Sequence, residues 1–500
     1  MKKVLSAAEM KACDTGTIEE YGIPSLVLME RAALGVCNVL FEKYPKANNI
    51  GIFCGPGNNG GDGVAIGRIL HNMGYSVKMI VLGNPEKFSP QLKQEIDIAV
   101  NYKTELLITG DITMDANCFD ELLEGTDLFI DAMFGIGLTR GLSGSFEHMA
   151  RFINNSGKPV IAVDIPSGFD TDSGKLLGDV GVKADTTVTF AYLKKGLLLG
   201  DCKAAAGEIK VADVGIYGAD ENAAALLDDS ILEVIPPRDV TANKGTCGKV
   251  LVIAGSENIY GACYLSANAA LTTGSGLVKV YTHKNNIQSI QQNLPEAMYL
   301  GYDDFNETEL LEQIKWADTI LIGPGLGISE VAVNIVNTIQ KSAQVPVVID
   351  ADGINIVAKN LPLFDELTGR VPVILTPHLK EMERLCGVPV KDINYDMEKV
   401  AKDFAVSHNC VVVLKNHTTV ISNVNTVFYC NSGNEGLATA GSGDVLAGII
   451  TSLLGQGLSA FDAAAAGTYI HGRAGAIATR TTGIKGLLAR DIIANINQLI

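Results

Sequence analysis

Short runs of β-branched and aliphatic residues recur along this chain, and most of them lead through glycine or aspartate into a segment with helical periodicity. Strands that alternate with helices form a parallel sheet that is covered on both faces, and ligands bind beyond the carboxyl ends of its strands. We therefore expect a doubly wound α/β protein. The expected strands are Ile50–Cys54, Val77–Leu82, Leu128–Asp131, Val160–Asp164, Thr187–Ala191, Lys249–Ala254, Leu277–Tyr281, Thr319–Ile322, Val347–Asp350, Val373–Thr376 and Val411–Leu414, followed by a hairpin of Thr418–Ser422 with Thr426–Cys430.

The length of the chain and a break in this pattern predict its domain organisation. A chain of 500 residues is expected to fold as two to three domains. The pattern is interrupted around residues 215–245, which contain Pro236-Pro237. Consecutive prolines neither continue a helix nor pair within a central strand. We expect an N-terminal domain over residues 1–218, a linker over 219–234 and a C-terminal domain over 235–500.

The charge of the chain argues against polyanionic partners. Lys and Arg number 39 against 56 Asp and Glu, for a formal net charge of −17. Neither half of the chain, divided at residue 218, is basic. Sequence-independent nucleic-acid binding and attachment to an anionic membrane both need positive charge, so we expect neither.

The sequence has the features of a soluble, cytoplasmic protein. Glu9 and Lys11 cut short the apolar run at the start of the chain, so we expect no signal peptide. The longest uncharged stretch, Val445–Phe461, is too short to span a bilayer comfortably and reads as a buried helix. The ten cysteines include no C-x-x-C pair, so we expect free, buried thiols in a reducing compartment.

The first candidate site begins where the expected strand Ile50–Cys54 ends. Residues 55–63 read Gly-Pro-Gly-Asn-Asn-Gly-Gly-Asp-Gly, and a helix is expected from Val64. Glycines at a strand-to-helix turn let backbone amides approach a phosphate, and the helix N-terminus adds positive potential. The chain contains no G-x-x-x-x-G-K-[ST] motif, which excludes a P-loop triphosphatase.

Two further strand ends carry carboxylates, Asp131 and Asp164. In a parallel sheet such ends converge on one crevice. Asn59, Asp131 and Ser167 could then supply oxygen ligands to a hard cation. The glycine-rich segment 135–141, which includes an arginine, could hold an anionic ligand. Each aspartate could instead cap the helix that follows it, and for a single residue this interpretation stays open.

Together these segments resemble the NAD(P)H-hydrate epimerase family. The resemblance covers about residues 1–218 and rests on Asn58–Gly63, Asp131–Gly135 and Asp164–Gly168. It extends to the helical segment Met29–Ala33, in which an arginine and an alanine stand where the family more often has asparagine and glycine.

This resemblance implies a set of functional residues. Asp164 is the candidate acid or base that inverts the hydrated nicotinamide carbon, which requires proton transfer. A potassium ion is implied at Asn59, Asp131 and Ser167. Substrate contacts are implied at Asn58, Asn59, Gly60, Gly61, Asp62, Gly135, Ile136, Gly137, Leu138, Thr139, Arg140, Gly141 and Asp164.

A second candidate site lies at the start of a helix near the C-terminus. Gly441–Asp444 precede apolar residues with helical spacing from Val445 to Leu454. The glycines therefore lie at a helix N-terminus, where backbone N–H groups can bind a terminal phosphate. Asp444 is placed to take a proton from an attacking hydroxyl, or is favoured there by the helix dipole alone. The motif by itself leaves both interpretations open.

The order of motifs in residues 235–500 resembles the ribokinase superfamily and, more closely, its NAD(P)H-hydrate dehydratase branch. Ile322–Gly327, Asp350–Asn355 and Thr376–Met382 all follow apolar strands, and Gly441–Asp444 comes last.

The second resemblance also implies site residues. Segment 415–419 occupies the nucleotide-binding turn, with Asn416 in place of the usual glycine. Because asparagine adopts left-handed conformations more readily than most residues, we expect the turn to be kept. His378 taken alone could equally be a structural histidine. Substrate contacts are implied at Ala262, Gly325, His378 and Asp444, and nucleotide contacts at Lys415, Asn416, His417, Thr418, Thr419 and Gly443.

The two resemblances imply a bifunctional metabolite-repair enzyme with a Rossmann-like epimerase domain and a ribokinase-like dehydratase domain. The first would interconvert the R and S forms of NAD(P)H hydrate. The second would dehydrate the S form at the expense of ADP or ATP and release phosphate, with Asp444 deprotonating the C6 hydroxyl and magnesium offsetting the phosphate charge. We expect potassium, magnesium and an adenine nucleotide to be required, and we expect a homo-oligomer.

Two other functions are compatible with the sequence. The chain could be a vitamin or sugar kinase of the ribokinase superfamily fused to a nucleotide-binding domain, and a stable phosphorylated product would then accumulate. The first half could instead be a non-catalytic binding module, although Asp164 and the complete Asn58–Asp62 loop argue against this.

Overall fold

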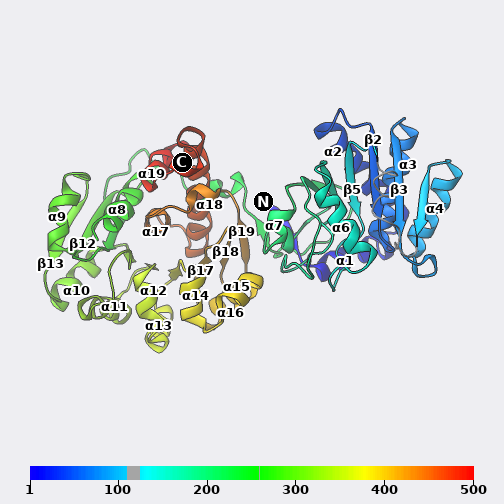
Figure 1. Cartoon of the computed structure of the whole chain (residues 1–500). Helices are drawn as coiled ribbons and strands as arrows, with labels where there is room; N and C mark the ends of the chain where they lie inside the picture. The colour runs from blue at the N-terminus through cyan, green and yellow to red at the C-terminus, as the bar shows by residue number, and fades with distance from the viewer. Residues whose placement is uncertain (110–123, 258) are drawn as a thin grey trace. The chain divides into compact units, whose positions relative to one another are not determined.

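The computed structural model divides the chain into two compact units, and each is built around its own sheet (Figure 1). The N-terminal unit comprises Lys3–Ala223, and the C-terminal unit comprises Met1–Lys2 with Ala224–Ile500. The structure describes residues 1–109, 124–257 and 259–500.

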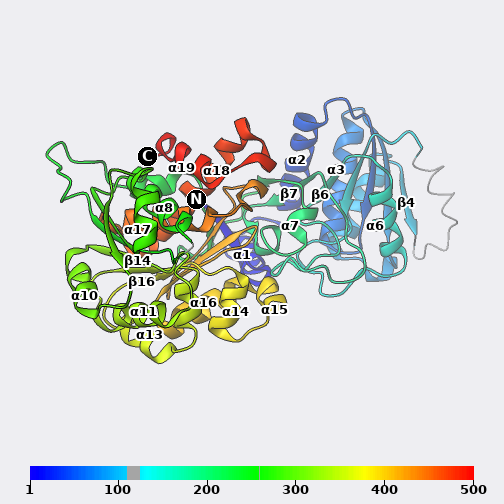
Figure 2. The same ribbon diagram turned by 60° about the vertical axis from the view of Figure 1, so that its left-hand side comes forward.

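The sheet of the N-terminal unit is parallel throughout, and its strand order changes direction once. From edge to edge the strands are β4 (Leu106–Thr109), β3 (Ser76–Leu82), β2 (Asn49–Cys54), β5 (Leu128–Ala132), β6 (Val160–Val163), β7 (Thr186–Phe190) and β9 (Glu208–Ala212). Figure 2 shows β4 at the edge of the unit. The change of direction lies between β2 and β5, where a doubly wound sheet binds its ligand.

Both faces of this sheet are buried. Ile50 and Ile52 of β2 pack in one apolar cluster with α2 and α3, whereas Phe53 packs in a second cluster with α6. Burial on both faces explains why the strand reads as apolar throughout. β1 (Lys2–Leu5) and β8 (Leu193–Lys194) form a short parallel pair. The helices are α1 (Ala7–Glu19), α2 (Ser25–Lys43), α3 (Asn58–Asn72), α4 (Pro90–Asn101), α6 (Ser145–Asn155) and α7 (Cys202–Ala205).

The C-terminal unit has a longer sheet that is parallel from β13 to β17. Within this unit the strands lie in the order β13 (Met298–Tyr302), β12 (Leu277–His283), β11 (Lys249–Ile253), β14 (Thr319–Ile322), β15 (Val347–Ile349), β16 (Val373–Leu375), β17 (Val411–Leu414), β18 (Thr419–Ser422), β19 (Val427–Cys430) and β10 (Ala225–Leu226). β18 is antiparallel to both of its neighbours, so β18 and β19 form the expected hairpin.

Helices cover this sheet on two sides (Figure 1). One group, α8 (Gly261–Thr272), α17 (Ser442–Gly455), α18 (Ala460–Thr482) and α19 (Ala489–Asn495), packs together. Val250 and Val252 of β11 and Val445 and Ile449 of α17 belong to the apolar cluster of this side. The remaining helices are α9 (Lys284–Gln291), α10 (Glu307–Trp316), α11 (Glu330–Ser342), α12 (Asp352–Val357), α13 (Leu361–Thr368), α14 (Leu379–Cys386), α15 (Val390–Tyr395) and α16 (Met397–His408).

The expected strands are all present, with ends shifted by at most about two residues, but two expected helices differ. The helix expected from Val64 begins at Asn58, because the glycines of its first turn pack tightly against the preceding loop. The single helix expected over Val445–Phe461 is two helices: α17 ends at Gly455 and α18 begins at Ala460.

Part of the segment expected as a linker, 219–234, is packed into the C-terminal unit. The division between the compact units falls after Ala223. Beyond it, β10 pairs with β19, and Ile231 is buried in the core of the C-terminal unit. Pro236-Pro237 therefore follows the boundary instead of marking it.

The described cysteines are free, and seven of them are buried, while Cys247 and Cys386 are half-buried and Cys118 lies outside the described residues. In the part of the chain that the structure describes, we find no helix with the length and apolar character needed to cross a bilayer.

Candidate active sites

At the carboxyl ends of β2, β5 and β6, residues from three strand ends meet around Gly135. A Cβ atom at Gly135 would lie 3.1 Å from Oδ1 of Asn59 and 3.4 Å from Oδ2 of Asp164. Asn59 comes from the first turn of α3, and Asp164 directly follows β6. Glycine at position 135 keeps the space between these two polar side chains open. The structure thus brings the three predicted segments together.

The start of α3 is fixed by close backbone packing. A Cβ atom at Gly60 would lie 1.9 Å from the carbonyl oxygen of Gly55, and one at Gly61 would lie 2.9 Å from Cε of Met29. Only glycine fits at position 60, because the added Cβ would meet backbone there, whereas at position 61 it would meet the flexible end of Met29. The helix can therefore begin directly at the loop. Its exposed first residue, Asn58, is presented at the helix N-terminus.

Asp131 is fully buried at the end of β5, and both oxygens of its carboxylate accept hydrogen bonds from neighbouring loops. Oδ1 accepts hydrogen bonds from the Ser167 hydroxyl at 2.8 Å and the Met133 amide at 3.2 Å, and Oδ2 accepts one from the Ser167 amide at 2.8 Å. Burial raises the pKa of Asp131 to about 6, and the hydrogen bonds from Ser167 oppose that rise. The buried carboxylate holds the loops after β5 and β6 together.

The oxygen atoms near Asp131 suit a hard cation. The Ser167 hydroxyl, which also accepts a hydrogen bond from the Phe134 amide at 2.9 Å, lies next to Asp131. The amide oxygen of Asn59 faces Gly135, while its buried Nδ2 has no hydrogen-bond partner. Carboxylate, hydroxyl and amide oxygens are the ligands that hard cations prefer. A cation here would also offset the burial that raises the Asp131 pKa.

Asp164 has a buried cationic partner that the sequence pattern did not reveal. Nζ of Lys194 lies 2.6 Å from Oδ1 of Asp164, and Lys194 is only 1% exposed. The same ammonium donates to the Thr189 hydroxyl and to the Phe190 carbonyl, both at 2.9 Å. Thr189 in turn donates to Oδ1 of Asp164 at 3.1 Å. These contacts fix Oδ1 and leave Oδ2 facing Gly135.

Two further carboxyl groups lie within electrostatic range of Asp164. Burial and the charge of Asp164 raise the pKa of Asp62 well above its ordinary value, and Lys194 only partly opposes the rise. The pKa of Asp14, in α1, is also raised, first by burial and then by Asp164. These raised pKa values favour a protonated carboxyl group beside Asp164. Asp14 is a further residue that the sequence pattern did not reveal.

The loop after β5 borders a cavity of about 270 Å³. Arg140, Leu138 and Gly141 line it, together with Phe134 and Phe146, whose ring centroids are 4.7 Å apart. The cavity thus combines a cationic side chain with an aromatic wall. Of the other predicted contacts in this loop, Ile136 is half-buried, and Gly137 and Thr139 are exposed.

In the C-terminal unit, Asp444 lies in the first turn of α17, whose N-cap is Gly441 with a φ of 83°. A Cβ atom at Gly443 would lie 3.6 Å from Nζ of Lys415 and 3.9 Å from Oδ2 of Asp350. Lys415 also pairs with Oδ1 of Asp350 at 3.0 Å. A helix N-terminus, a lysine and two carboxylates therefore meet at the carboxyl ends of β15 and β17.

The charges of this centre act on one another. Burial raises the pKa of Asp444 to about 7, with a further rise from Asp350, while Lys415 lowers it. Burial alone would lower the pKa of Lys415, but Asp350 and Glu381 outweigh it, and the net shift is upward. At neutral pH the lysine is therefore charged, and Asp444 titrates close to the pH at which a general base works best.

Backbone strain marks both centres. Asp164 has a φ of 69°, and Ala351, which follows Asp350, has a φ of 49°. Non-glycine residues seldom adopt such values, and they persist where surrounding structure enforces them, often at functional sites. The first of these residues is the aspartate that follows β6, and the second comes directly after the aspartate that follows β15.

His471 anchors the start of α17. Nε2 of His471, in α18, lies 3.1 Å from the hydroxyl of Ser442. Burial lowers the pKa of His471 to about 4, so the imidazole is neutral at physiological pH. The contact positions the glycine turn without adding charge. The sequence pattern gave no signal for His471.

His378 has a structural role and is also open to solvent. Its Nδ1 accepts a hydrogen bond from the Glu381 amide at 3.1 Å, and Oε2 of Glu381 accepts one from the His378 amide at 2.8 Å. This reciprocal pair caps α14. The side chain is nevertheless 51% exposed, and the backbone of His378 pairs with Lys415. The ring thus stands beside the charged centre.

The predicted nucleotide turn is present, but Asn416 is not left-handed. The described non-glycine residues with positive φ are Lys103, Asp164, Ala191, Ala351 and Asn409. Asn416 therefore does not use the left-handed conformation that asparagine tolerates. Its Nδ2 instead donates to Oδ1 of Asn394 at 2.8 Å, which holds the turn without that conformation. In the rest of the turn His417 is exposed, Thr418 is buried and Thr419 begins β18.

Ala262 and Gly325, the other predicted substrate residues, are in contact. A Cβ atom at Gly325 would lie 2.9 Å from Cβ of Ala262, and Gly325 has a φ of 59°. The first turn of α8 and the loop after β14 therefore close against each other.

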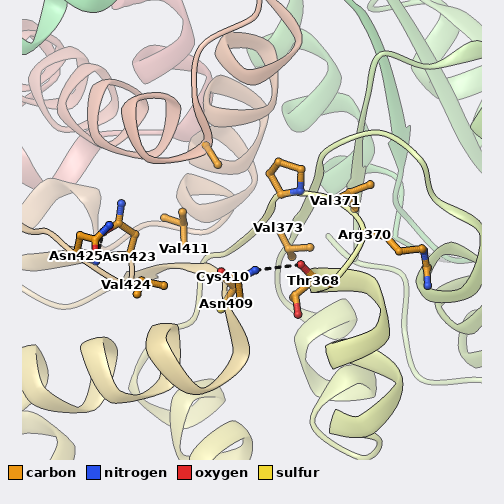
Figure 3. Close-up of a pocket in the computed structure, with 13 residues that line it drawn as sticks. Thr368, Arg370, Val371, Val373, Asn409, Cys410, Val411, Asn423, Val424 and Asn425 are labelled. Carbon is orange, nitrogen blue, oxygen red and sulfur yellow. Dashed lines mark hydrogen bonds between the residues drawn. The ribbon is translucent and has the colours of Figure 1, made fainter.

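A separate cavity of about 630 Å³ lies at the amino ends of β16 and β17 in the same sheet (Figure 3). Val373 and Val411, which line it, begin β16 and β17, whereas Lys415 follows the other end of β17. This cavity therefore contains none of the predicted site residues.

Family comparisons divide the chain in the same way as the structure. Residues 25–196 match the family described as the YjeF-related protein N-terminus, and residues 250–498 match the family described as NAD(P)H-hydrate dehydratase. Among solved structures, a ribokinase-like superfamily protein of Enterococcus faecalis V583 is 28% identical with a TM-score of 0.51, and the match covers 57% of this chain and 97% of that chain.

Full-length relatives combine both parts. The bifunctional NAD(P)H-hydrate repair enzyme Nnr of Moorella thermoacetica is 37% identical over 98% of this chain and 95% of its own length. The protein of the same name from Thermofilum pendens is 35% identical over 97% of this chain and 94% of its own length. The chain therefore belongs to the family of bifunctional NAD(P)H-hydrate repair enzymes.

Proposed function

We propose that this chain repairs hydrated NADH and NADPH by two reactions. The N-terminal unit interconverts the R and S hydrates, and the C-terminal unit dehydrates the S form at the expense of ADP or ATP, releasing phosphate. One observation carries the proposal. Each unit places a carboxylate near a lysine at the carboxyl ends of its strands: Asp164 with Lys194, and Asp444 with Lys415.

In the C-terminal unit, Asp444 takes the proton from the C6 hydroxyl of the hydrate. The oxygen attacks the terminal phosphorus of the nucleotide, and the bond from that phosphorus to its bridging oxygen breaks. Backbone amides at Gly441–Gly443 and the Lys415 ammonium offset the charge on the transferred group. The ring nitrogen then expels phosphate from C6, and loss of a proton from C5 completes the double bond of the reduced nicotinamide.

Magnesium fits this centre as a companion of the nucleotide. No cluster of three or more His, Cys, Asp or Glu side chains suited to a metal occurs among the described residues. Magnesium in kinase-like sites is typically held by one or two carboxylates and by phosphate oxygens. Asp350 would supply such a carboxylate and leave Asp444 free to act as the base. When bound, the ion neutralises phosphate charge.

In the N-terminal unit, the chemistry of C6 determines which proton transfers the site must carry out. C6 bears a hydroxyl group and the ring nitrogen, so its configuration inverts when one of these bonds breaks and re-forms on the other face. Such a step needs one proton delivered and one removed. Asp164 is the acid or base, with Oδ2 facing Gly135. Asp62, whose pKa is raised, is placed to hold the second proton.

Potassium is proposed at Asn59, Asp131 and Ser167, supported by their oxygen atoms around the loop after β5. Ser167→Ala removes one neutral ligand and leaves the buried carboxylate in place. It should raise the potassium concentration that half-activates epimerisation, with dehydration unchanged. Asp131→Ala should weaken potassium binding further. Epimerisation by both variants at the ordinary potassium concentration would reject the site.

The remaining proposals concern the whole chain. We propose that epimerisation resides in residues 1–218 and dehydration in residues 235–500, and that the protein is cytoplasmic and homo-oligomeric. Its net charge of −17 supports the absence of nucleic-acid and membrane partners.

One assay tests both reactions. Mixed epimers of NADH hydrate are incubated with ADP or ATP, and NADH is followed by its absorbance. The intact protein should convert both epimers, whereas Asp164→Asn should stop near the amount of S form present at the start. Accumulation of a phosphorylated product without recovery of NADH would instead identify a kinase.

A further inference from the structure

A buried arginine ties three helices of the N-terminal unit together. Arg68, in α3, is only 8% exposed. Its Nη2 donates a hydrogen bond to the carboxylate of Glu30 in α2, and its Nε lies 3.8 Å from Oε2 of Glu95 in α4. Cζ of the same guanidinium lies 5.8 Å from the ring centroid of Tyr102, which follows α4. One guanidinium group therefore contacts both helices that pack against α3.

The same three helices also meet two turns earlier, at the start of α3. Gly61 lies seven residues before Arg68 and so on the same face of the helix. A Cβ atom at Gly61 would lie 2.9 Å from Cε of Met29 and 3.6 Å from Cα of Leu92. These two residues lie in α2 and α4, within one turn of the carboxylates that the arginine contacts. The ion cluster and the first turn of α3 therefore rest on the same two helices.

On the face toward the sheet, α3 packs through glycines. A Cβ atom at Gly63 would lie 2.6 Å from Cβ of Ala132, and one at Gly67 would lie 2.1 Å from Sδ of Met79. A helix keeps its register with its neighbours through side chains that fit into their grooves, and glycine has no side chain to offer. The position of α3 along its own axis therefore depends on its other contacts, which include the ion cluster.

The ion cluster is better suited to fixing position than to adding stability. Glu95 is 2% exposed, and burial raises the pKa of its carboxyl group while Arg68 lowers it. Nε of Arg68 and Oε2 of Glu95 form no hydrogen bond with any described residue. Buried ion pairs often contribute no more stability than apolar contacts of the same size, and their best-attested role is to fix the register between helices.

We propose that Arg68 is a positioning residue for epimerisation, which holds α3 against α2 and α4 so that Asn59 stays beside Asp164. This inference rests on the epimerase function proposed above. The amide oxygen of Asn59 and Oδ2 of Asp164 both face Gly135, at 3.1 Å and 3.4 Å from a Cβ atom built there. Because Asn59 belongs to the first turn of α3, a shift of the helix along its axis changes this spacing directly.

Arg68→Lys tests this role, because lysine keeps the charge but lacks the planar group that reaches two carboxylates at once. Arg151→Lys is the matched control: Arg151 is exposed and pairs at 2.8 Å with Glu147, four residues earlier in α6. Hydrogen exchange of the full chain, followed by mass spectrometry, should show residues 61–66 exchanging about tenfold faster in Arg68→Lys than in the control. Glu95→Gln, which keeps the shape of the side chain, should loosen the same segment to a smaller extent.

A double-mutant cycle with Asn59→Ala separates positioning from a general loss of stability. If Arg68 acts through the first turn of α3, Arg68→Lys should lower kcat/KM for epimerisation about tenfold on its own and less than about twofold when Asn59→Ala is already present. Dehydration should be unchanged in every variant.

Two results would overturn the positioning role and leave the epimerase function standing. One is a pair of losses that multiply in the double variant, and the other is exchange in residues 61–66 that matches the Arg151→Lys control. If the unaltered protein does not epimerise the hydrate, the proposed function fails, while faster exchange in Arg68→Lys would still support the hold of the arginine on α3.

Discussion

The ionisation of Asp444 sets the expected pH dependence of the C-terminal reaction. Burial raises its pKa to about 7, above the ordinary value of 3.8, so a fraction of the carboxyl groups is protonated at neutral pH. A carboxyl group acts as a base only when ionised. Dehydration should therefore increase as the pH rises through about 7 and then level off, as measured by kcat/KM for the S hydrate over that range.

Asp444→Asn removes the base and keeps the size of the side chain. Dehydration should fall by about 10²–10⁴. The melting temperature should change little, since the helix start remains capped by Gly441 and by the Ser442 contact with His471. The residual rate should also lose its dependence on pH near neutrality. Near-normal turnover of this variant would contradict the role of Asp444 as the base and would leave only its favourable interaction with the helix dipole.

Lys194→Met tests the ion pair of the N-terminal centre. Removing one partner of a buried pair leaves the other charge without compensation and typically costs about 3–5 kcal/mol. The N-terminal unit should therefore unfold at lower temperature, and epimerisation at a permissive temperature should fall at least about tenfold. Dehydration should be unaffected. Lys195→Met, at the neighbouring half-buried position, is the control. Equal loss in both variants would contradict a specific role for Lys194.

The partners of the predicted residues could not be read from the sequence. Lys194 stands in the run Leu193-Lys194-Lys195, which has the composition of a solvated surface turn. Its burial depends on the pairing of β8 with β1, two segments that lie far apart in the sequence, so no local pattern predicts it. The aspartates were predictable because each follows an apolar strand, and such positions converge in a parallel sheet.

At the scale of elements, the central strands were predictable and several edge strands were not. β14 and β17 are buried on both faces and read as apolar runs. β9, by contrast, is a half-exposed edge strand with Glu208 and Lys210, and β10 has only two residues. Edge strands carry charged residues because charge discourages pairing with other chains. These charged residues interrupt the apolar run by which a central strand is recognised in a sequence.

The packing of α3 gives a prediction at the same scale. In Gly60→Ala the new Cβ would meet the Gly55 carbonyl oxygen at 1.9 Å, and neither backbone segment can yield without moving the helix start. We expect destabilisation of the N-terminal unit by about 1–3 kcal/mol and loss of epimerisation. Gly16→Ala, inside α1 with open space around it, should be neutral or slightly stabilising. Equal melting temperatures for the two variants would contradict the packing argument.

For the whole molecule, the two compact units predict independent folding. Each has its own buried clusters and its own sheet. Fragments 1–223 and 224–500 should both be soluble, and the first should epimerise the hydrate without nucleotide. Calorimetry of the intact chain should show two transitions that match those of the fragments. Aggregation of both fragments would mean that the units need each other to fold.

The buried thiols give each unit an internal reporter of its opening. Burial raises the pKa of Cys37 to about 12 and that of Cys263 to about 11, so almost no reactive thiolate exists at neutral pH in the folded protein. An alkylating reagent should therefore modify these two side chains only when their unit opens, and mass spectrometry of the two peptides would give separate opening rates. The half-buried Cys247 and Cys386 should react first. By the same chemistry, peroxide should oxidise Cys247 and Cys386 before it oxidises the buried thiols.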